Sequence, residues 1–116
     1  MKKTTIQNLA LSVRQPFAEQ IMRGTKRIEY RSIPTRIRGR VYIYASKLPK
    51  IDAFREMGFE PGAFPTGVIV GSVEIADCVE KRFEYEWKLA NPKRLRVPIK
   101  PETHPQPVWF KPFKER

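Results

Sequence analysis

Short runs of strand-forming residues, separated by glycine and proline, make up most of this sequence and limit the folds that it can adopt. Within residues 40–46, aliphatic side chains alternate with tyrosine and serine, the pattern of a strand that buries one face. Other strands are predicted over residues 9–13, 26–31, 68–78, 85–89, 95–99 and 108–110. Helical patterns cover only residues 16–23 and 51–57. The sequence therefore predicts a mostly β fold of the α+β class, a small and mostly antiparallel β-barrel with two short helices.

The first predicted helix has recognisable signals at both of its ends. Pro16 suits the first turn, where a missing N–H costs nothing, and Gly24 can close the helix in the left-handed conformation. Phe17 and Ile21 are four residues apart and would share one face. A helix of about two turns is expected to precede the strand at residues 26–31.

The C-terminal segment, residues 98–116, contains five prolines. Proline lacks a backbone donor and favours extended backbone, so this segment is not expected to form a helix. We expect it to wrap the barrel as an extended tail, with Trp109 and Phe110 packed onto the strands.

With 116 residues, the chain is expected to form a single domain, residues 1–116, around one hydrophobic core. Its single cysteine, Cys78, excludes an internal disulfide, and one histidine, His104, adds no metal-binding pair. We therefore expect no structural metal and no cofactor, and Cys78 as a small buried hydrophobe. Apolar runs stay shorter than the roughly 18 residues of a membrane span, so we expect a cytoplasmic protein without membrane contact.

The charge is strongly positive and unevenly distributed. The formal net charge is +11, from 23 lysines and arginines against 12 acidic residues. Residues 14–40 contain eight basic and two acidic residues, and residues 88–100 contain five basic residues and no acid. This imbalance favours a polyanionic partner such as RNA or another nucleic acid. A merely cationic, solvated surface is the alternative.

The segment GTKRIEYR, residues 24–31, combines one carboxylate with three basic side chains directly after the predicted helix. In an extended strand Arg27, Glu29 and Arg31 would share one face, because successive side chains alternate. A carboxylate braced by arginines can orient their planar donors towards a phosphate or a base edge. An ordinary ion network on a solvated sheet face is the other interpretation.

Three ordered segments, ALSVRQPFA (residues 10–18), GTKRIEYR (24–31) and TRIRG (35–39), resemble the ASCH domain, the activating signal cointegrator homology family. The resemblance continues through YIYAS (42–46), GVIVGSVEIADC (67–78) and WKLANP (87–92). It implies a fold like the PUA domain, a small barrel with helices at its rim, and a role in RNA metabolism. The family's glycine, lysine and acid-x-arginine pattern falls on Gly24, Lys26, Glu29 and Arg31, in a cleft between the first helix and the barrel.

The resemblance also implies possible catalysis, since some relatives are ribonucleases or amidohydrolases that deacylate a modified cytidine. In the amidohydrolase branch a threonine works with the motif lysine, and this chain has Glu29 where that threonine would fall. This departure argues against the amidohydrolase activity. If the chain is a hydrolase, its acid and base candidates are Lys26, Glu29 and Glu74.

The candidate contacts to nucleic acid fall into three chemical classes. Basic side chains would contact phosphates, polar ones would bind a base edge, and an aromatic ring would stack on an unpaired base. The candidates are Arg14, Gln15, Lys26, Arg31, Arg36, Arg38, Ser46 and Trp87. Tyr42 and Tyr44 are further stacking candidates, although aromatic residues on barrel strands more often belong to the core.

Two functions remain open from the sequence, together with a minor third. The first is a binding module whose basic cleft holds phosphates and a base or nucleotide. The second is a small hydrolase acting on RNA or on a modified nucleoside such as acylated cytidine. A protein interaction through the proline-rich tail is the third.

Overall fold

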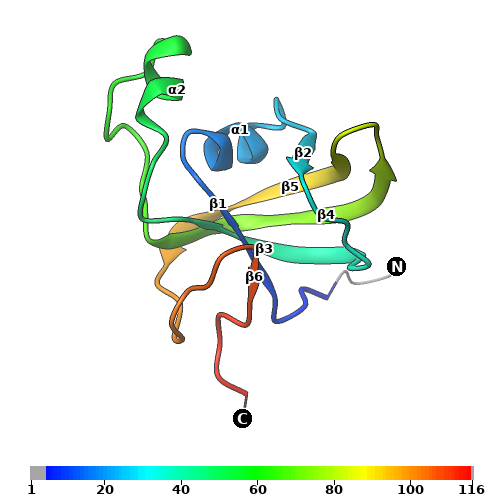
Figure 1. Ribbon diagram of the computed structural model, residues 1–116. Helices are drawn as coiled ribbons and strands as arrows, with labels where there is room; N and C mark the ends of the chain where they lie inside the picture. The colour runs from blue at the N-terminus through cyan, green and yellow to red at the C-terminus, as the bar shows by residue number, and fades with distance from the viewer. Residues whose placement is uncertain (1–4, 116) are drawn as a thin grey trace.

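A computed structural model describes residues 5–115 and confirms the predicted fold class, a mostly β fold with two short helices. Over these residues six strands form one sheet that curls into a half-barrel, in the order β2-β5-β4-β3-β1-β6 (Figure 1). The elements in chain order are β1 (Ala10–Val13), α1 (Phe17–Arg23), β2 (Ile28–Arg31), β3 (Gly39–Ala45), α2 (Ile51–Glu56), β4 (Val68–Glu80), β5 (Tyr85–Ile99) and β6 (Trp109–Phe110).

The sheet is antiparallel except at one pair, because β1 and β3 run parallel. The intervening α1 and β2 make this possible, since parallel neighbours need a crossover rather than a tight hairpin. β2 pairs with β5 at the far end of the sheet, and β6 pairs with β1 at the other. The end strands β2 and β6 therefore come from distant parts of the sequence, whereas β1, the neighbour of β6, is joined to β2 through α1. α1 itself packs against β3, β4 and β5.

The core lies between α1 and the inner face of the sheet, where Leu11, Ile21, Ile43 and Val73 are almost completely buried. A smaller cluster on the other face contains Tyr44 and Ile69, and β6 covers it with Phe110. Each face of β3 is thus covered, one by α1 and the other by the C-terminal segment. Burial of this apolar area, at roughly 25 cal/mol per Å², is the main force that holds the layers together.

The C-terminal segment is anchored by the two aromatic residues that the sequence indicates. Trp109 stacks on Trp87 with ring centroids 5.7 Å apart and planes 9° apart. Phe110 meets the Tyr44 ring edge-on at 5.2 Å. Further along, Asn8 and the backbone of Phe113 exchange two hydrogen bonds, which joins the two ends of the described chain.

The strand boundaries differ from the prediction at Asn91 and Pro92. Residues 85–89 and 95–99 were predicted as separate strands, but β5 runs unbroken from Tyr85 to Ile99. The pairing with β4 shifts register at three places, one of them opposite residues 90–93. A bulge accommodates a proline within a sheet, because the extra residue needs no ladder hydrogen bond. β2 also begins only at Ile28, not at Lys26.

α1 ends as predicted, with Gly24 in the left-handed conformation at φ 77° and its N–H bonded to carbonyls of the last turn. Cys78 is a free thiol and only half buried, so the expectation of a buried cysteine is wrong. No helix within residues 5–115 has the length and apolar character needed to cross a membrane. The described part of the chain also holds no group of three or more histidine, cysteine or acidic side chains placed to bind a metal.

Candidate functional site

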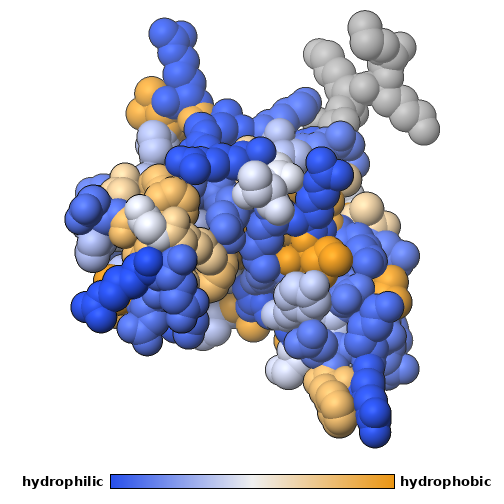
Figure 2. Space-filling model, turned by 90° about the horizontal axis from the view of Figure 1, so that it is seen from above, coloured by the Kyte–Doolittle hydropathy of each residue, from blue (hydrophilic) through white to orange (hydrophobic). Residues whose placement is uncertain are grey.

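A cleft of about 860 Å³ lies between the two ends of the curled sheet. Its walls come from β1, α1, β2, the end of β3 and residues 104–108 of the C-terminal segment. Clefts of this size commonly hold nucleotide-sized molecules. The face seen from above in Figure 2 is mostly hydrophilic, and apolar side chains are exposed there in separate patches.

Glu29 is buried in the wall of this cleft, only 7% exposed, and is held by two cationic side chains. Arg31 donates from Nε at 2.9 Å and from Nη2 at 2.5 Å to the same carboxylate oxygen, Oε2. Lys26 Nζ lies 3.5 Å from the other oxygen, Oε1. A buried carboxylate needs such partners, because leaving it unpaired would carry a large desolvation penalty.

Arg31 also connects β2, at one end of the sheet, with β1, the neighbour of the other end strand β6. Its Nη2 donates to the Ser12 carbonyl of β1 at 2.9 Å, although Arg31 itself lies on β2. Its guanidinium carbon is 5.6 Å from the centre of the Trp87 ring. The side chain is therefore fixed by an ion pair, a backbone carbonyl and an aromatic surface, while it still lines the cleft.

The pairing of Glu29 differs from the prediction. Strand alternation placed Arg27 beside Glu29 and Lys26 on the opposite face, but β2 begins only at Ile28. In the irregular backbone before β2, Lys26 turns towards Glu29, and the exposed Arg27 donates to the Gly24 carbonyl at 3.2 Å. The alternation rule fails because it applies only within a strand.

Aromatic and aliphatic side chains form the remaining walls. Lys26 Nζ lies 5.5 Å from the ring centres of both Phe17 and Tyr30, within the range of cation–π attraction. Tyr30 is 49% exposed and so has ring surface available to a ligand. Further apolar lining comes from Val13, Tyr44, Leu48, Pro105, Pro107 and Val108.

Further polar groups line the mouth of the cleft. Arg14 is exposed and is held by hydrogen bonds from its guanidinium to the carbonyls of Leu48, at 2.9 Å, and Pro49, at 3.0 Å. Ser46 and the exposed Lys47 lie at the end of β3. Of the predicted contacts, Arg14, Lys26, Arg31 and Ser46 are thus brought together in one cleft.

The cleft also contains residues that were not among the predicted contacts, notably the aromatic Tyr30 and the basic or titratable Lys47 and His104. His104 stands in the proline-rich segment, 73 positions after Arg31, and no local motif marks it. It reaches the cleft because β6 pairs with β1 and because Ser12 Oγ donates to the Gln106 carbonyl at 2.7 Å. Lys47 directly follows a predicted strand. Its position next to the candidate Ser46 was the only sequence signal that it could lie in the cleft.

Gln15 and Trp87 are buried and lie outside the cleft lining. The Gln15 side chain donates to the Pro65 carbonyl at 3.0 Å and accepts from the Glu19 N–H at 2.9 Å. Trp87 is 0% exposed, and its Nε1 donates to the Ile33 carbonyl at 3.1 Å. Trp87 therefore has no exposed face on which a base could stack.

Of the remaining candidates, Tyr44 lines the cleft but is only 2% exposed, and the others lie away from the lining. Arg36 and Arg38 are exposed in the loop before β3, and Arg38 Nη2 is 3.7 Å from Asp77. Glu74, on β4, is paired with the buried Arg40 at 3.4 Å. Tyr42 packs edge-on against Phe113 on the outer face of the sheet.

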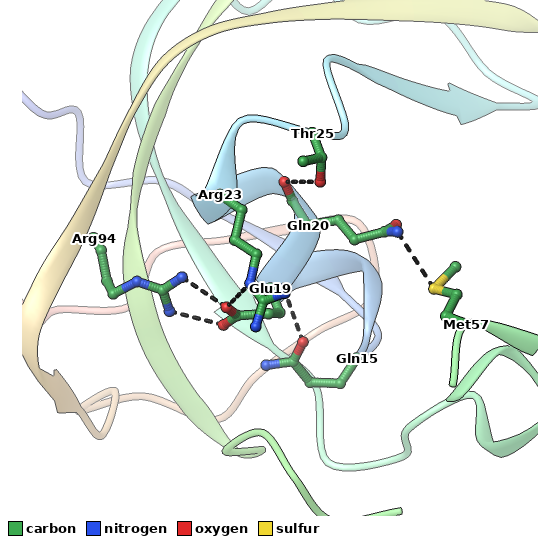
Figure 3. A network of polar contacts seen from close by, with 7 residues as sticks. All are labelled: Gln15, Glu19, Gln20, Arg23, Thr25, Met57 and Arg94. Carbon is green, nitrogen blue, oxygen red and sulfur yellow. Dashed lines mark hydrogen bonds and ion pairs between the residues drawn. The ribbon is translucent and has the colours of Figure 1, made fainter. Parts of the chain in front are cut away.

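A second carboxylate fixes α1, the helix that supplies Phe17 to the cleft (Figure 3). Glu19 accepts two hydrogen bonds from Arg94, both at 2.8 Å, and one from Arg23 at 2.7 Å. Burial by itself would raise the pKa of Glu19, but the hydrogen bonds from Arg94 and Arg23 outweigh it and lower the pKa below 4.5. The network links α1 to β5 and so holds one wall of the cleft against the sheet.

Comparison with known proteins agrees with this architecture. The family profile of the ASCH domain matches residues 11–103, which include most of β1, all of β2 to β5 and most cleft residues. The chain belongs to the ASCH domain family. Activating signal cointegrator 1 of Homo sapiens is 34% identical, in an alignment that covers 66% of this chain and 16% of that protein. The Mus musculus protein of the same name is 33% identical with the same coverage, so this chain spans about a sixth of the relatives' length.

The fold of this ASCH domain also resembles that of a solved relative. The crystal structure of ASCH from Zymomonas mobilis superposes with a TM-score of 0.63 over 89% of this chain and 85% of that one. The two sequences are only 15% identical. This likeness therefore concerns the fold alone.

Proposed function

We propose that this ASCH domain binds single-stranded RNA and that the cleft holds one nucleotide. The observation that carries the proposal is the pairing of Lys26 and Arg31 with one buried carboxylate inside the cleft. Glu29 holds both cations in the cleft lining, so that the donors they do not use on Glu29 can bind a phosphate there. Charge-assisted hydrogen bonds from such fixed donors are among the strongest polar contacts in proteins.

The composition of the cleft supports a nucleotide over a purely apolar ligand. Arg14, Lys26, Arg31 and Lys47 bring four cationic side chains to the lining, against the single carboxylate of Glu29. The walls between them are apolar or aromatic, which suits the face of a base. An unpaired base is the form of RNA that proteins usually read by stacking, so a single strand fits better than a duplex.

Tyr30 is the aromatic side chain best placed to stack on that base. It lines the cleft and is about half exposed, whereas Trp87 is enclosed. Ser46 can bind a base edge, and Arg14 can contact a phosphate at the mouth. Arg36 and Arg38, outside the cleft, would attract the strand without selecting a nucleotide.

The alternative of a hydrolase has less support from the geometry. Both Glu29 oxygens are engaged by cations, which suits a carboxylate that orients its neighbours rather than one that transfers a proton. Glu74 is paired with Arg40 outside the cleft and would not reach a substrate bound there. Lys26 would remain as the main catalytic candidate.

Fluorescence anisotropy with labelled single-stranded RNA tests the proposal. Binding should be detectable at 50 mM salt and weaken about tenfold by 150 mM if about three phosphates are contacted, since the salt slope for single strands is about 0.7 per contact. Lys26→Ala should weaken binding clearly, and Lys26→Arg should keep much of the affinity, because a phosphate contact depends chiefly on charge. Arg55→Ala, on the exposed side of α2, serves as the matched control.

Different outcomes would contradict different parts of the proposal. Absence of binding at 50 mM salt, or binding indifferent to salt, would refute it as a whole. Arg36→Ala combined with Arg38→Ala should weaken binding to all sequences alike, whereas Lys26→Ala and Arg31→Ala should act on particular nucleotides. Incubation of the wild type with total RNA and with acylated cytidine completes the test, because a product lost in Lys26→Arg would establish the hydrolase instead.

A further inference from the structure

A second hollow, of about 360 Å³, adjoins the cleft on the other side of Lys26. Lys26 lines both spaces, so they are neighbours along the surface. The floor of the second hollow is apolar and consists of the core side chains Ile21, Val73 and Leu89. Arg27 and Asn91 provide polar groups in its lining.

Arg27 is oriented but has no acidic partner among residues 5–115. Its Nε donates to the Gly24 carbonyl at 3.2 Å, which fixes the direction of the guanidinium. The two Nη atoms remain available, since the ion pairs of the described residues do not include Arg27. A guanidinium fixed at Nε presents the fork that suits a phosphate.

Asn91 is held on two sides by a hydrogen-bond network whose residues do not line the cleft. Its side-chain Nδ2 donates to Glu74 Oε2 at 3.2 Å, and its backbone carbonyl accepts a hydrogen bond from Arg40 Nη2 at 2.8 Å. Arg40 is only 3% exposed and also donates to Ser72. Burying an arginine is costly unless it is well paired. Several polar contacts of this network thus hold one asparagine, Asn91, in position.

The geometry of Asn91 determines which atom it can offer. A carboxylate such as Glu74 only accepts hydrogen bonds, so it selects the donor Nδ2 and leaves the acceptor Oδ1 without a partner in the described chain. The backbone of Asn91 has φ 50°, in the left-handed region that asparagine tolerates better than most residues. Conformations of this kind cluster at binding sites, where the surrounding structure enforces them.

We propose that the second hollow binds the neighbouring nucleotide of the same single strand, an inference that rests on the proposed function of the cleft. Lys26 stands between the two nucleotides, Arg27 contacts the phosphate of the second, and the apolar floor receives its base. Asn91 Oδ1 accepts a hydrogen bond from an exocyclic amino group. Adenine or cytosine, which carry such a group on an accessible edge, should therefore be preferred over uracil in this position.

A comparison of mononucleotides and dinucleotides tests this inference on the whole chain. Affinities are measured by calorimetry for 5′-UMP, pUpU, pUpA and pApU. The wild type should bind pUpU about tenfold more tightly than 5′-UMP, which corresponds to one added charge-assisted contact. Arg27→Ala should remove most of that gain and leave the affinity for 5′-UMP within twofold, whereas Arg55→Ala should leave both affinities unchanged.

Asn91→Gly tests the base contact without straining the backbone, because glycine adopts positive φ readily. This variant should weaken binding of one adenine-containing isomer, pUpA or pApU, by about tenfold and leave pUpU within twofold. Its affinity for 5′-UMP reports whether the cleft remains folded.

Equal affinity of the wild type for 5′-UMP and pUpU, or an equal loss of both in Arg27→Ala, would overturn the second site while the proposed function stands. An equal loss for all three dinucleotides in Asn91→Gly would overturn the base contact. Failure of every nucleotide to bind would overturn the proposed function and this inference together.

Discussion

Replacing Arg31 by alanine is expected to destabilise the fold by about 2–3 kcal/mol, because this one side chain links the end strand β2 to β1 across the cleft. The substitution removes two hydrogen bonds to the buried Glu29 carboxylate and one to the Ser12 carbonyl. It also leaves Glu29 with Lys26 as its only cationic partner among the described residues, at 3.5 Å. The loss is therefore structural as well as functional.

The magnitude follows from these contacts. Hydrogen bonds to a charged group contribute about 1.5–3 kcal/mol, and the lower end applies because the Arg31 side chain is 21% exposed and partly screened by water. The bond to the Ser12 carbonyl adds about 1 kcal/mol, which brings the total to about 2.5 kcal/mol. For a chain of this length, the melting temperature should fall by roughly 10 °C.

Urea unfolding followed by circular dichroism measures the change, with Arg27→Ala as the matched control. Arg27 is exposed and makes one hydrogen bond, so its substitution should change stability by no more than about 0.5 kcal/mol. In a double-mutant cycle, Arg31→Ala and Glu29→Gln should together cost at least about 1 kcal/mol less than the sum of the single effects. A loss below about 0.5 kcal/mol for Arg31→Ala, or strict additivity, would refute the reasoning.

Three further outcomes can be checked by the same unfolding assay. Hydrogen bonds from Arg94 and Arg23 outweigh the effect of burial and lower the pKa of Glu19 below 4.5. The ion pairs of Glu19 therefore stabilise the fold above that pH, and this stabilisation is lost as the pH falls through the folded-state pKa. The difference in unfolding free energy between wild type and Glu19→Gln should narrow between pH 6 and pH 3. Gly71→Ala should cost about 1–3 kcal/mol or more, because the added Cβ would lie 2.3 Å from the Lys93 carbonyl oxygen. Trp87→Ala should cost about 3–5 kcal/mol by opening a cavity beneath the cleft, and a smaller effect than that of Arg31→Ala would contradict its place in the core.

Local signals in the sequence predicted the elements that depend on a few neighbouring residues. Gly24 ends α1 because a left-handed residue suits glycine, and Lys26, Glu29 and Arg31 lie within six positions, so a single turn and strand bring them together. Local signals failed where the backbone departs from regular geometry. The register shift near Pro92 keeps β5 continuous. Because β2 begins only at Ile28, Lys26 rather than Arg27 lies beside Glu29.

Burial was the property that separated true cleft residues from the other candidates. Gln15 and Trp87 have side chains suited to a base, but each is enclosed by a segment distant in sequence. The 57–67 segment supplies the carbonyl that binds Gln15, and β6 supplies the tryptophan that stacks on Trp87. A sequence pattern states which side chains share a face, and only packing decides whether that face meets water or protein.

By itself, the sequence determined the β-rich fold class, the boundaries of α1, the excess of positive charge and the motif that places Glu29 among cations. Only the tertiary structure decided that the cleft lies between the two ends of one curled sheet and that His104 reaches it. The tertiary structure also brought together Arg40, Glu74 and Asn91, which lie on three adjacent strands and are linked by hydrogen bonds. The physical reason is range: turns, caps and alternation arise from interactions within a few residues, whereas strand order and burial depend on which distant segments exclude water together.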